Sequence, residues 1–170
     1  MRRPFPLVAA ALAAVGLFVA GLGLAASGST PTKLSARLVA RSETPRPKGA
    51  SRASGLFTAT LSGSSLSWRL TFSRLTGKAL AAHVHLGRPG VAGPVVVPLC
   101  APCASGVHGT KKVTAKVRSA LLSGGAYVNV HTAKNPGGEI RGQVTGGGRP
   151  AATSTTESEP TTTDDGGYGG

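Results

Sequence analysis

Two segments of this chain alternate polar and apolar residues, and they contain three of its four histidines. The first segment is Ala82-His83-Val84-His85, and the second is Tyr127-Val128-Asn129-Val130-His131-Thr132. In an extended backbone, every second side chain points to the same face of the sheet. The alternation therefore predicts two β-strands that bury their valines and direct His83, His85 and His131 to the outer face.

A third alternating segment follows the second one after a loop rich in glycine and proline. Ile140 and Val144 lie on its apolar side, and Glu139 and Arg141 lie on its polar side. A loop of this composition between two alternating segments is typical of a hairpin. We therefore expect Asn129, Glu139 and Arg141 to form an exposed surface site beside the histidines.

The rest of the central region adds further short strands and one helix. Alternation predicts a strand over 33–41, a hairpin that joins a strand around Phe57 to one around Trp68, and a strand over 95–99. Between residues 110 and 122, Val113, Val117 and Leu121 recur every four positions, and Gly124-Gly125 follows, which predicts one short helix. We expect seven or so strands in an all-β antiparallel sandwich or Greek-key barrel with that helix.

At the two histidine segments the chain resembles the chordin-type (CHRD) domain family, through its Ala-His-hydrophobic-His and Tyr-Val-Asn-Val-His-Thr motifs. The resemblance extends over about residues 33–145 and includes Glu43-Thr44-Pro45, the turn Leu86-Gly87-Arg88-Pro89-Gly90 and the segment Gly93 to Leu99. It implies a secreted, stand-alone β-rich domain of poorly defined biochemical activity. The family resemblance thus indicates a fold more than a function.

The two ends of the chain have compositions unlike that of the central domain. Residues 1–28 combine Arg2-Arg3 with a long apolar run and small residues, as in an export signal. Residues 7–26 are also long enough to remain as a membrane anchor, which would be the only contact with a membrane. Residues 146–170 consist mostly of Gly, Thr, Ser, Pro and acids, which predicts a disordered tail. We expect a secreted or cell-envelope protein.

Positive charge is concentrated in the central part of the chain. Residues 27–149 carry 17 Lys and Arg against two carboxylates, Glu43 and Glu139, whereas the tail from Pro150 onward carries four acids and no base. A surface of this kind attracts acidic partners. The expected function is a binding or structural module for an anionic polymer or an extracellular protein. Nucleic acid is not an expected partner for an exported chain.

The three histidines of the alternating segments are the candidate metal ligands of the chain. Two imidazoles at positions i and i+2 of a strand point to one side, and His131 on a neighbouring strand could complete a copper or zinc site with His83 and His85. The spacing resembles that on the copper side of copper-zinc superoxide dismutases, but the chain has no Asp before Asp164 to supply the zinc ligand of those enzymes. The alternative is a structural set of hydrogen bonds without a metal, and a fourth ligand would require the approach of His108.

Two further observations concern redox chemistry and catalysis. Cys100 and Cys103 are the only cysteines, and in an exported chain such a pair is expected to form a structural disulfide. Hydrolytic catalysis is not expected, because Glu43 and Glu139 are the only carboxylates before the tail and no acid is evident to orient a catalytic histidine.

Overall fold

The computed structural model describes residues 30–50 and 52–146. The predicted signal or anchor over 1–28 lies outside the described residues, as does the predicted tail over 146–170 except for Gly146, which belongs to a strand. Strands are β1 (Thr32–Val39), β2 (Ser54–Ser62), β3 (Ser65–Ser73), β4 (Ala79–Leu86), β5 (Val95–Cys100), β6 (His108–Lys112), β7 (Ala126–Thr132), β8 (Ile140–Gln143) and β9 (Thr145–Gly146). Helices are the 3-10 helix η1 (Ala40–Ser42) and the α-helix α1 (Ala115–Ser123). No helix of the described part is long and apolar enough to cross a membrane.

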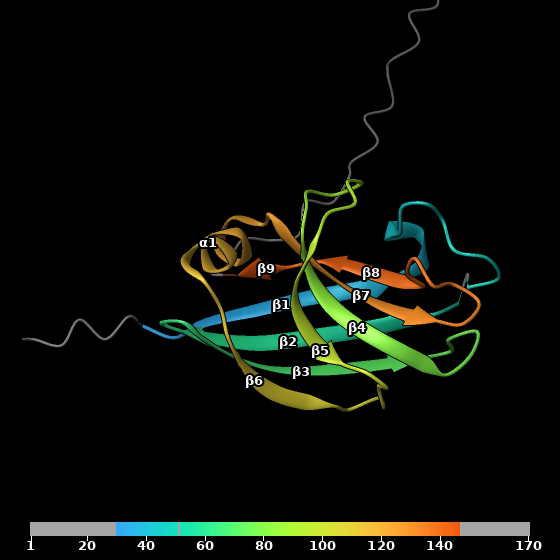
Figure 1. Ribbon diagram of the computed structural model, residues 1–170, viewed down its shortest axis with the longest axis horizontal. Coiled ribbons are helices and arrows are strands. Elements are labelled where there is room, and N and C mark those ends of the chain that lie inside the picture. The colour runs from blue at the N-terminus through green and yellow to red at the C-terminus, as the bar shows by residue number, and fades with distance from the viewer. Residues whose placement is uncertain (1–29, 51, 147–170) are drawn as a thin grey trace, which may run out of the picture.

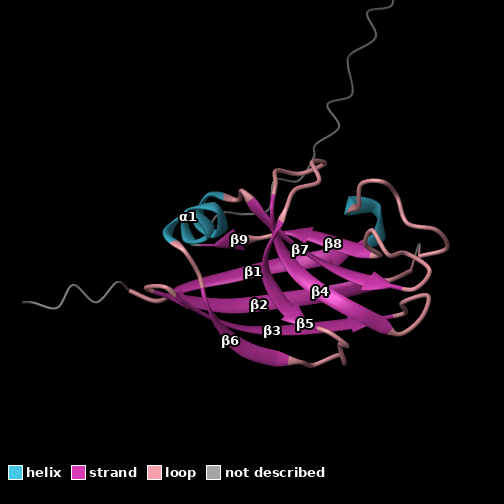
Figure 2. Ribbon diagram, in the orientation of Figure 1, coloured by secondary structure: helices cyan, strands magenta, loops and turns pink. Residues whose placement is uncertain are grey.

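The strands form one antiparallel sheet that folds over into a nearly closed barrel or sandwich. Their order is β5-β4-β7-β8-β1-β2-β3-β6, with β9 paired to β1. The strands β4 and β5 cross in front of β1, β2 and β3 (Figure 1). The strand β8 joins the group of β4, β5 and β7 to the group of β1, β2, β3 and β6 by pairing with β7 and, at Val39 and Arg141, with β1. The expected all-β antiparallel fold with one α-helix is confirmed, with nine strands in the described residues (Figure 2).

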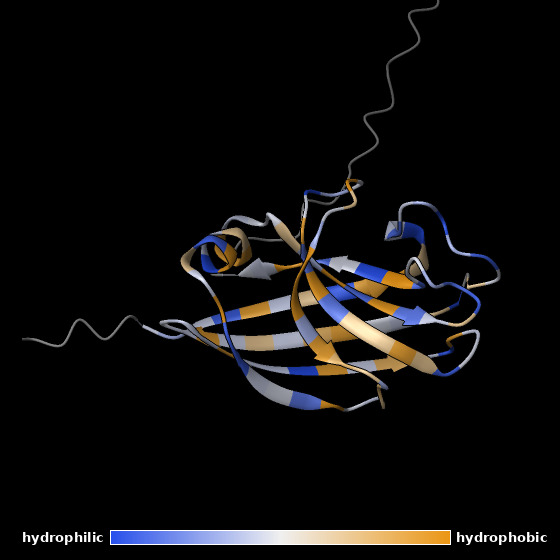
Figure 3. Ribbon diagram, in the orientation of Figure 1, coloured by the Kyte–Doolittle hydropathy of each residue, from blue (hydrophilic) through white to orange (hydrophobic). Residues whose placement is uncertain are grey.

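The core lies between the two groups of strands and is built from alternate residues of each strand. Hydrophobic and polar residues alternate along the ribbons (Figure 3), as expected for strands with one buried face. Fully buried side chains come from both groups: Leu38, Phe57, Leu61, Leu66, Leu70, Val84, Val128, Val130 and Ile140. Removing such side chains from water is the main favourable contribution to folding. The valines of β4 and β7 thus point inward, as the alternation predicts.

The helical segment is shorter than its sequence pattern indicates. The helix α1 begins after Thr114, whose hydroxyl accepts a hydrogen bond from the Val117 backbone N–H, and ends at Gly124, which has φ 78°. The prediction that the segment is helical from residue 110 was wrong, because residues 108–112 form β6, which pairs with β3. That strand, His-Gly-Thr-Lys-Lys, has no apolar residue. This segment is extended because it pairs with β3 at the edge of the sheet. Its sequence does not alternate polar and apolar residues, so the strand could not be predicted from periodicity.

Candidate functional site

Three neighbouring strands place most of the predicted site residues on one outer face of the sheet, whereas Glu139 lies in the bend before β8. In the pairing of β4 with β7, His83 lies opposite Asn129 and His85 lies opposite Tyr127. In the pairing of β7 with β8, Asn129 lies opposite Arg141. Because paired residues share a face of the sheet, this part of the prediction is confirmed. The strands β4, β7 and β8 lie side by side in Figure 1.

The three imidazoles of this face form a compact cluster. One ring nitrogen from each of His83, His85 and His131 lies within 4.8 Å of the others. His83 Nδ1 and His131 Nε2 are 3.1 Å apart, and the ring centroids of His83 and His85 are 5.7 Å apart. These distances bring three ring nitrogens close together, and the 3.1 Å contact is a hydrogen bond between two of the rings. His108, the fourth histidine, lies on β6 opposite Arg69 and is not part of the cluster.

Backbone carbonyl groups hold two of the three rings in position. His85 Nδ1 lies 2.9 Å from the Gly93 carbonyl oxygen, and His131 Nδ1 lies 2.9 Å from the Pro136 carbonyl oxygen. A carbonyl oxygen only accepts hydrogen bonds, so each Nδ1 carries a proton and each Nε2 of the neutral ring carries a lone pair. The Nε2 atom of His85 is buried and has no hydrogen-bond partner among the described residues.

The environment of the cluster lowers the pKa of two of its histidines. Burial lowers the pKa of His83, and repulsion from His131 and His85 lowers it further. Burial also lowers the pKa of His131, with repulsion from His85 in the same direction, although the Pro136 carbonyl opposes this. Burial and neighbouring positive charge both disfavour the imidazolium form. Both rings are therefore expected to be neutral at physiological pH.

Tyr127 forms the wall of the cluster between His85 and Arg141. The Tyr127 and His85 rings are stacked, with centroids 4.8 Å apart and planes inclined by 10°. The Arg141 guanidinium carbon lies 3.4 Å from the centroid of the Tyr127 ring. The Arg141 Nη2 atom also donates hydrogen bonds of 2.9 Å to the carbonyl oxygens of Arg88 and Val91. The sequence did not single out Tyr127, although its place in the motif beside Asn129 was visible.

The expectation of an exposed surface site at Asn129, Glu139 and Arg141 was wrong. Asn129 and Arg141 point outward from β7 and β8, and Glu139 lies in the bend before β8, but their exposed fractions are 2%, 2% and 0%. Arg141 is covered because its guanidinium binds the loop after β4, as described above. Glu139 is covered by Thr76 and Asn135, which bind its carboxylate. Loops that fold back over the sheet thus convert an outer face into a second, polar interior.

The Glu139 carboxylate joins the segments that cover this face, because it accepts hydrogen bonds from Thr76, Thr132 and Asn135. Thr76 binds the carboxylate through both its backbone N–H and its hydroxyl, and Thr132 and Asn135 donate from their side chains. Burial alone raises the pKa of Glu139, but these four hydrogen bonds outweigh it and hold the pKa below its ordinary value. Backbone, hydroxyl and amide donors of Thr76, Thr132 and Asn135 thus bind the carboxylate in its ionised form.

Glu43, the other carboxylate of the domain, has the opposite environment. Its side chain is buried, and its Oε1 atom has no hydrogen-bond partner in the described structure. Burial raises its pKa to about 7, although attraction to Arg141 and hydrogen bonds from the Thr44 backbone and the Asn129 side chain oppose the rise. Glu43 and Asn129 thus meet Arg141 beneath the loops. The sequence identified Glu43 only as one of two carboxylates, because this contact depends on how the 3-10 helix η1 returns to β8.

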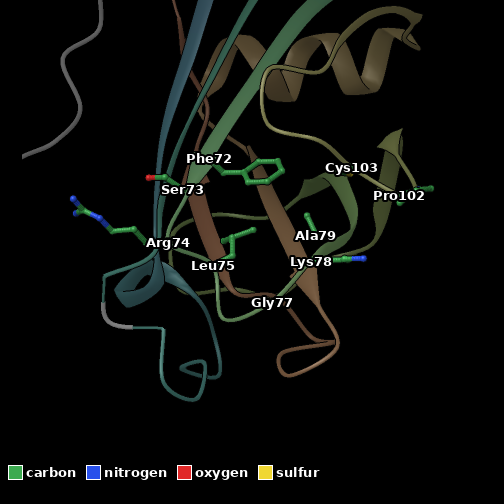
Figure 4. Close-up of a pocket in the computed structure, with 9 residues that line it drawn as sticks. All are labelled: Phe72, Ser73, Arg74, Leu75, Gly77, Lys78, Ala79, Pro102 and Cys103. Carbon is green, nitrogen blue, oxygen red and sulfur yellow. The ribbon is translucent and has the colours of Figure 1, made fainter.

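The cysteine pair lies near the end of β3 and the start of β4, and none of the three clustered histidines lines the hollow there. Cys100 and Cys103 are joined by a disulfide with their Cα atoms 5.3 Å apart, as expected. Beside them lies an open hollow of about 400 Å³ at the end of β3 and the start of β4. Figure 4 shows the apolar side chains of Phe72 and Leu75 in this hollow and the charged groups of Arg74 and Lys78 at its rim.

A comparison with protein families identifies the class to which this fold and site belong. The model of the CHRD domain matches residues 34–144, which is most of the described structure. The chain therefore belongs to the CHRD-domain family. Comparisons with curated proteins and with solved structures gave no significant match. CHRD domains are typically extracellular and are generally protein-interaction modules.

Proposed function

We propose that this domain is an extracellular binding module that holds an anionic polymer on the outer face of β1, β2, β3 and β6. We call this surface the basic face. It consists of the outward side chains of the four strands: Lys33, Ser35, Arg37, Leu56, Thr58, Thr60, Ser67, Arg69, Thr71, His108, Thr110 and Lys112. It contains four cations and no carboxylate.

The observation that carries the proposal is the register of these strands. Lys33, Thr60, Ser67 and Thr110 are successive cross-strand partners, and Ser35, Thr58, Arg69 and His108 form the next such row. Strands are separated by about 4.8 Å, and side chains on one face of a strand repeat every 6.8 Å or so. The cations and hydroxyls therefore occupy regularly spaced positions that suit an extended chain of repeated acidic units.

The basic face is available for binding because its cations have no acidic neighbour. Glu43 and Glu139 are the only carboxylates of the described residues, and both are buried beneath the loops of the other strands. Lys33 Nζ donates to the Thr60 hydroxyl at 2.9 Å, and Ser67 and Thr110 have their hydroxyl oxygens 3.1 Å apart. The side chains are thus arranged along the strands by hydrogen bonds, and their positive charge is not neutralised.

Salt-dependent retention on immobilised heparin, a sulfated polysaccharide, tests the proposal. A triple variant, Lys33→Ser with Arg37→Ser and Arg69→Ser, is expected to elute at much lower salt than the wild type, because screening weakens exposed charge interactions. The matched control is Arg46→Ser with Lys78→Ser and Lys116→Ser, which removes the same charge from exposed positions outside the basic face. Equal losses in both variants would show that only net charge matters and would refute the proposal.

A compact acidic protein is the other class of partner that this charge could attract. The surface charges of such a protein lack the regular repeat of a polymer, so fewer of them would contact the cations of the basic face. Serum albumin, an acidic protein, is therefore expected to bind more weakly than a carboxylated polysaccharide such as polygalacturonate. Tighter binding of the protein would favour a protein partner instead.

A further inference from the structure

We propose that His83 Nδ1, His85 Nε2 and His131 Nε2 form a binding site for one divalent transition-metal ion, with copper preferred over zinc. This function goes beyond the proposed binding of a polymer and uses the opposite group of strands. The donors belong to β4 and β7, whereas the basic face belongs to β1, β2, β3 and β6. Each proposal can therefore fail without the other.

The spacing of the three donors is close to that of a metal site. Bonds from a metal ion to imidazole nitrogen are about 2.0 to 2.1 Å long, so two nitrogens on one ion are at most about 4.2 Å apart. The 3.1 Å between His83 Nδ1 and His131 Nε2 is already within this limit, and the widest spread in the cluster is 4.8 Å. A shift of about half an ångström in one ring brings all three donors into range.

The hydrogen bonds of the cluster fix which ring nitrogens carry lone pairs. His131 Nε2 accepts from the protonated Nδ1 of His83 at 3.1 Å, so a bound metal ion would replace this hydrogen bond and the His83 proton. The carbonyl oxygens of Gly93 and Pro136 fix the protonated Nδ1 atoms of His85 and His131, which leaves both Nε2 lone pairs directed away from the backbone. Metal-bound histidines generally donate their second ring nitrogen to a carbonyl or carboxylate in this way. His83, which has no such anchor and is half exposed, is the ring that can turn to complete the site.

An unpartnered atom provides independent support. His85 is 7% exposed, and its Nε2 atom has no hydrogen-bond partner among the described residues. A buried polar atom without a partner is costly and rare in native proteins. A metal ion bound among the three rings would satisfy this atom. The rings of His83 and His131 are half-buried, so part of the cluster is open to solvent.

The donor set selects the kind of metal. Three imidazoles without a carboxylate or thiolate suit copper, zinc or nickel, whereas magnesium and calcium require oxygen ligands. Both cysteines are held in the disulfide and cannot contribute. Among divalent ions of the first transition row, copper generally binds nitrogen donors most tightly. We therefore expect Cu²⁺ to bind more tightly than Zn²⁺, and Mg²⁺ not to bind.

The experiment uses the full chain, without an affinity tag, after treatment with a chelator. Copper sulfate and zinc sulfate are added separately, free metal is removed, and bound metal is measured by elemental analysis. One Cu²⁺ per chain is expected, with nitrogen hyperfine structure in its electron paramagnetic resonance spectrum. His85→Gln and His131→Gln are each expected to weaken Cu²⁺ binding by at least about 100-fold, because loss of even an outer-shell partner of a metal ligand can cost that much. His108→Gln, which changes the histidine outside the cluster, should bind as the wild type does.

A second measurement keeps the test valid if a variant fails to fold. In the wild-type protein labelled with ¹⁵N-histidine, Zn²⁺ is expected to shift the resonances of His83 Nδ1, His85 Nε2 and His131 Nε2 and to leave those of His108 unchanged. The absence of stoichiometric metal would overturn the proposal. So would equal loss of binding in His108→Gln, or zinc-induced shifts confined to His108, either of which would indicate adventitious binding only.

Discussion

The Arg141 guanidinium stacks on the ring of Tyr127, with its central carbon 3.4 Å from the ring centroid, and the same group donates to the carbonyl oxygens of Arg88 and Val91. One side chain thus joins β8, the motif strand β7 and the loop after β4. Planar stacking and hydrogen bonds to two carbonyl oxygens together are specific to arginine. This relationship makes Arg141 a structural centre of the polar interior.

Replacing Arg141 with lysine is expected to lower the free energy of unfolding by about 3 kcal/mol. The lysine retains the charge, but it cannot stack in the same way while reaching both carbonyl oxygens, which would leave buried polar groups unpaired. Urea unfolding followed by the fluorescence of Trp68, the only tryptophan, measures the change. Lys78→Arg, at an exposed position, is the control and should have almost no effect. A loss below 1 kcal/mol in Arg141→Lys would contradict the assigned role.

Glu43→Gln is expected to stabilise the protein at pH 8 and to have little effect at pH 5. The pKa of Glu43 rises on folding from 4.5 to about 7, so between these values the folded state binds more protons than the unfolded state. By linkage, this group makes stability fall as the pH rises through that window. The gain at pH 8 should be about 1 to 2 kcal/mol, reduced by partial solvent screening. Unfolding at several pH values tests this, and identical pH profiles for both proteins would refute it.

Glu139→Gln is expected to destabilise the protein at pH 7 by about 2 to 4 kcal/mol, because a glutamine amide cannot accept all four hydrogen bonds of the carboxylate. The pKa of Glu139 falls on folding from its ordinary 4.5, so its contribution is present above that value. It is lost as the pH falls through the lower folded pKa. The difference between variant and wild type should therefore shrink in acid. A constant difference across this range would argue against the assigned hydrogen bonds.

Gly93→Ala is expected to destabilise the loop over the histidines, since an added Cβ would overlap the carbonyl oxygen of Leu86. The loop would have to move, and His85 would lose its hydrogen bond to the Gly93 carbonyl oxygen. Gly137→Ala is the matched control, because no atom lies within 4 Å of a Cβ placed there. We expect a loss of about 2 kcal/mol or more for Gly93→Ala and almost none for Gly137→Ala. Thermal unfolding compares them, and equal melting temperatures would refute this account.

Much of the sheet and of the histidine cluster could be predicted from the sequence. Alternation placed Val84, Val128 and Val130 in the core and three histidines on one outer face, because the strand period is strictly two residues. It could not indicate β6, which has neither an apolar residue nor a buried one to produce an alternating pattern. Nor could it indicate that loops cover Asn129, Glu139 and Arg141, because that depends on contacts between distant segments.

The sequence by itself determined which side chains share a face, since local periodicity sets the direction of each side chain along a strand. It also indicated the CHRD family and the disulfide between Cys100 and Cys103. Only the tertiary structure decided that the face of His83 and His131 is a partly covered polar interior and that the face of Lys33 and Arg69 is open. The physical reason is that the burial of a strand residue depends on the loops that pack over it. Those loops are distant in the sequence, so the local pattern of the strand cannot predict them.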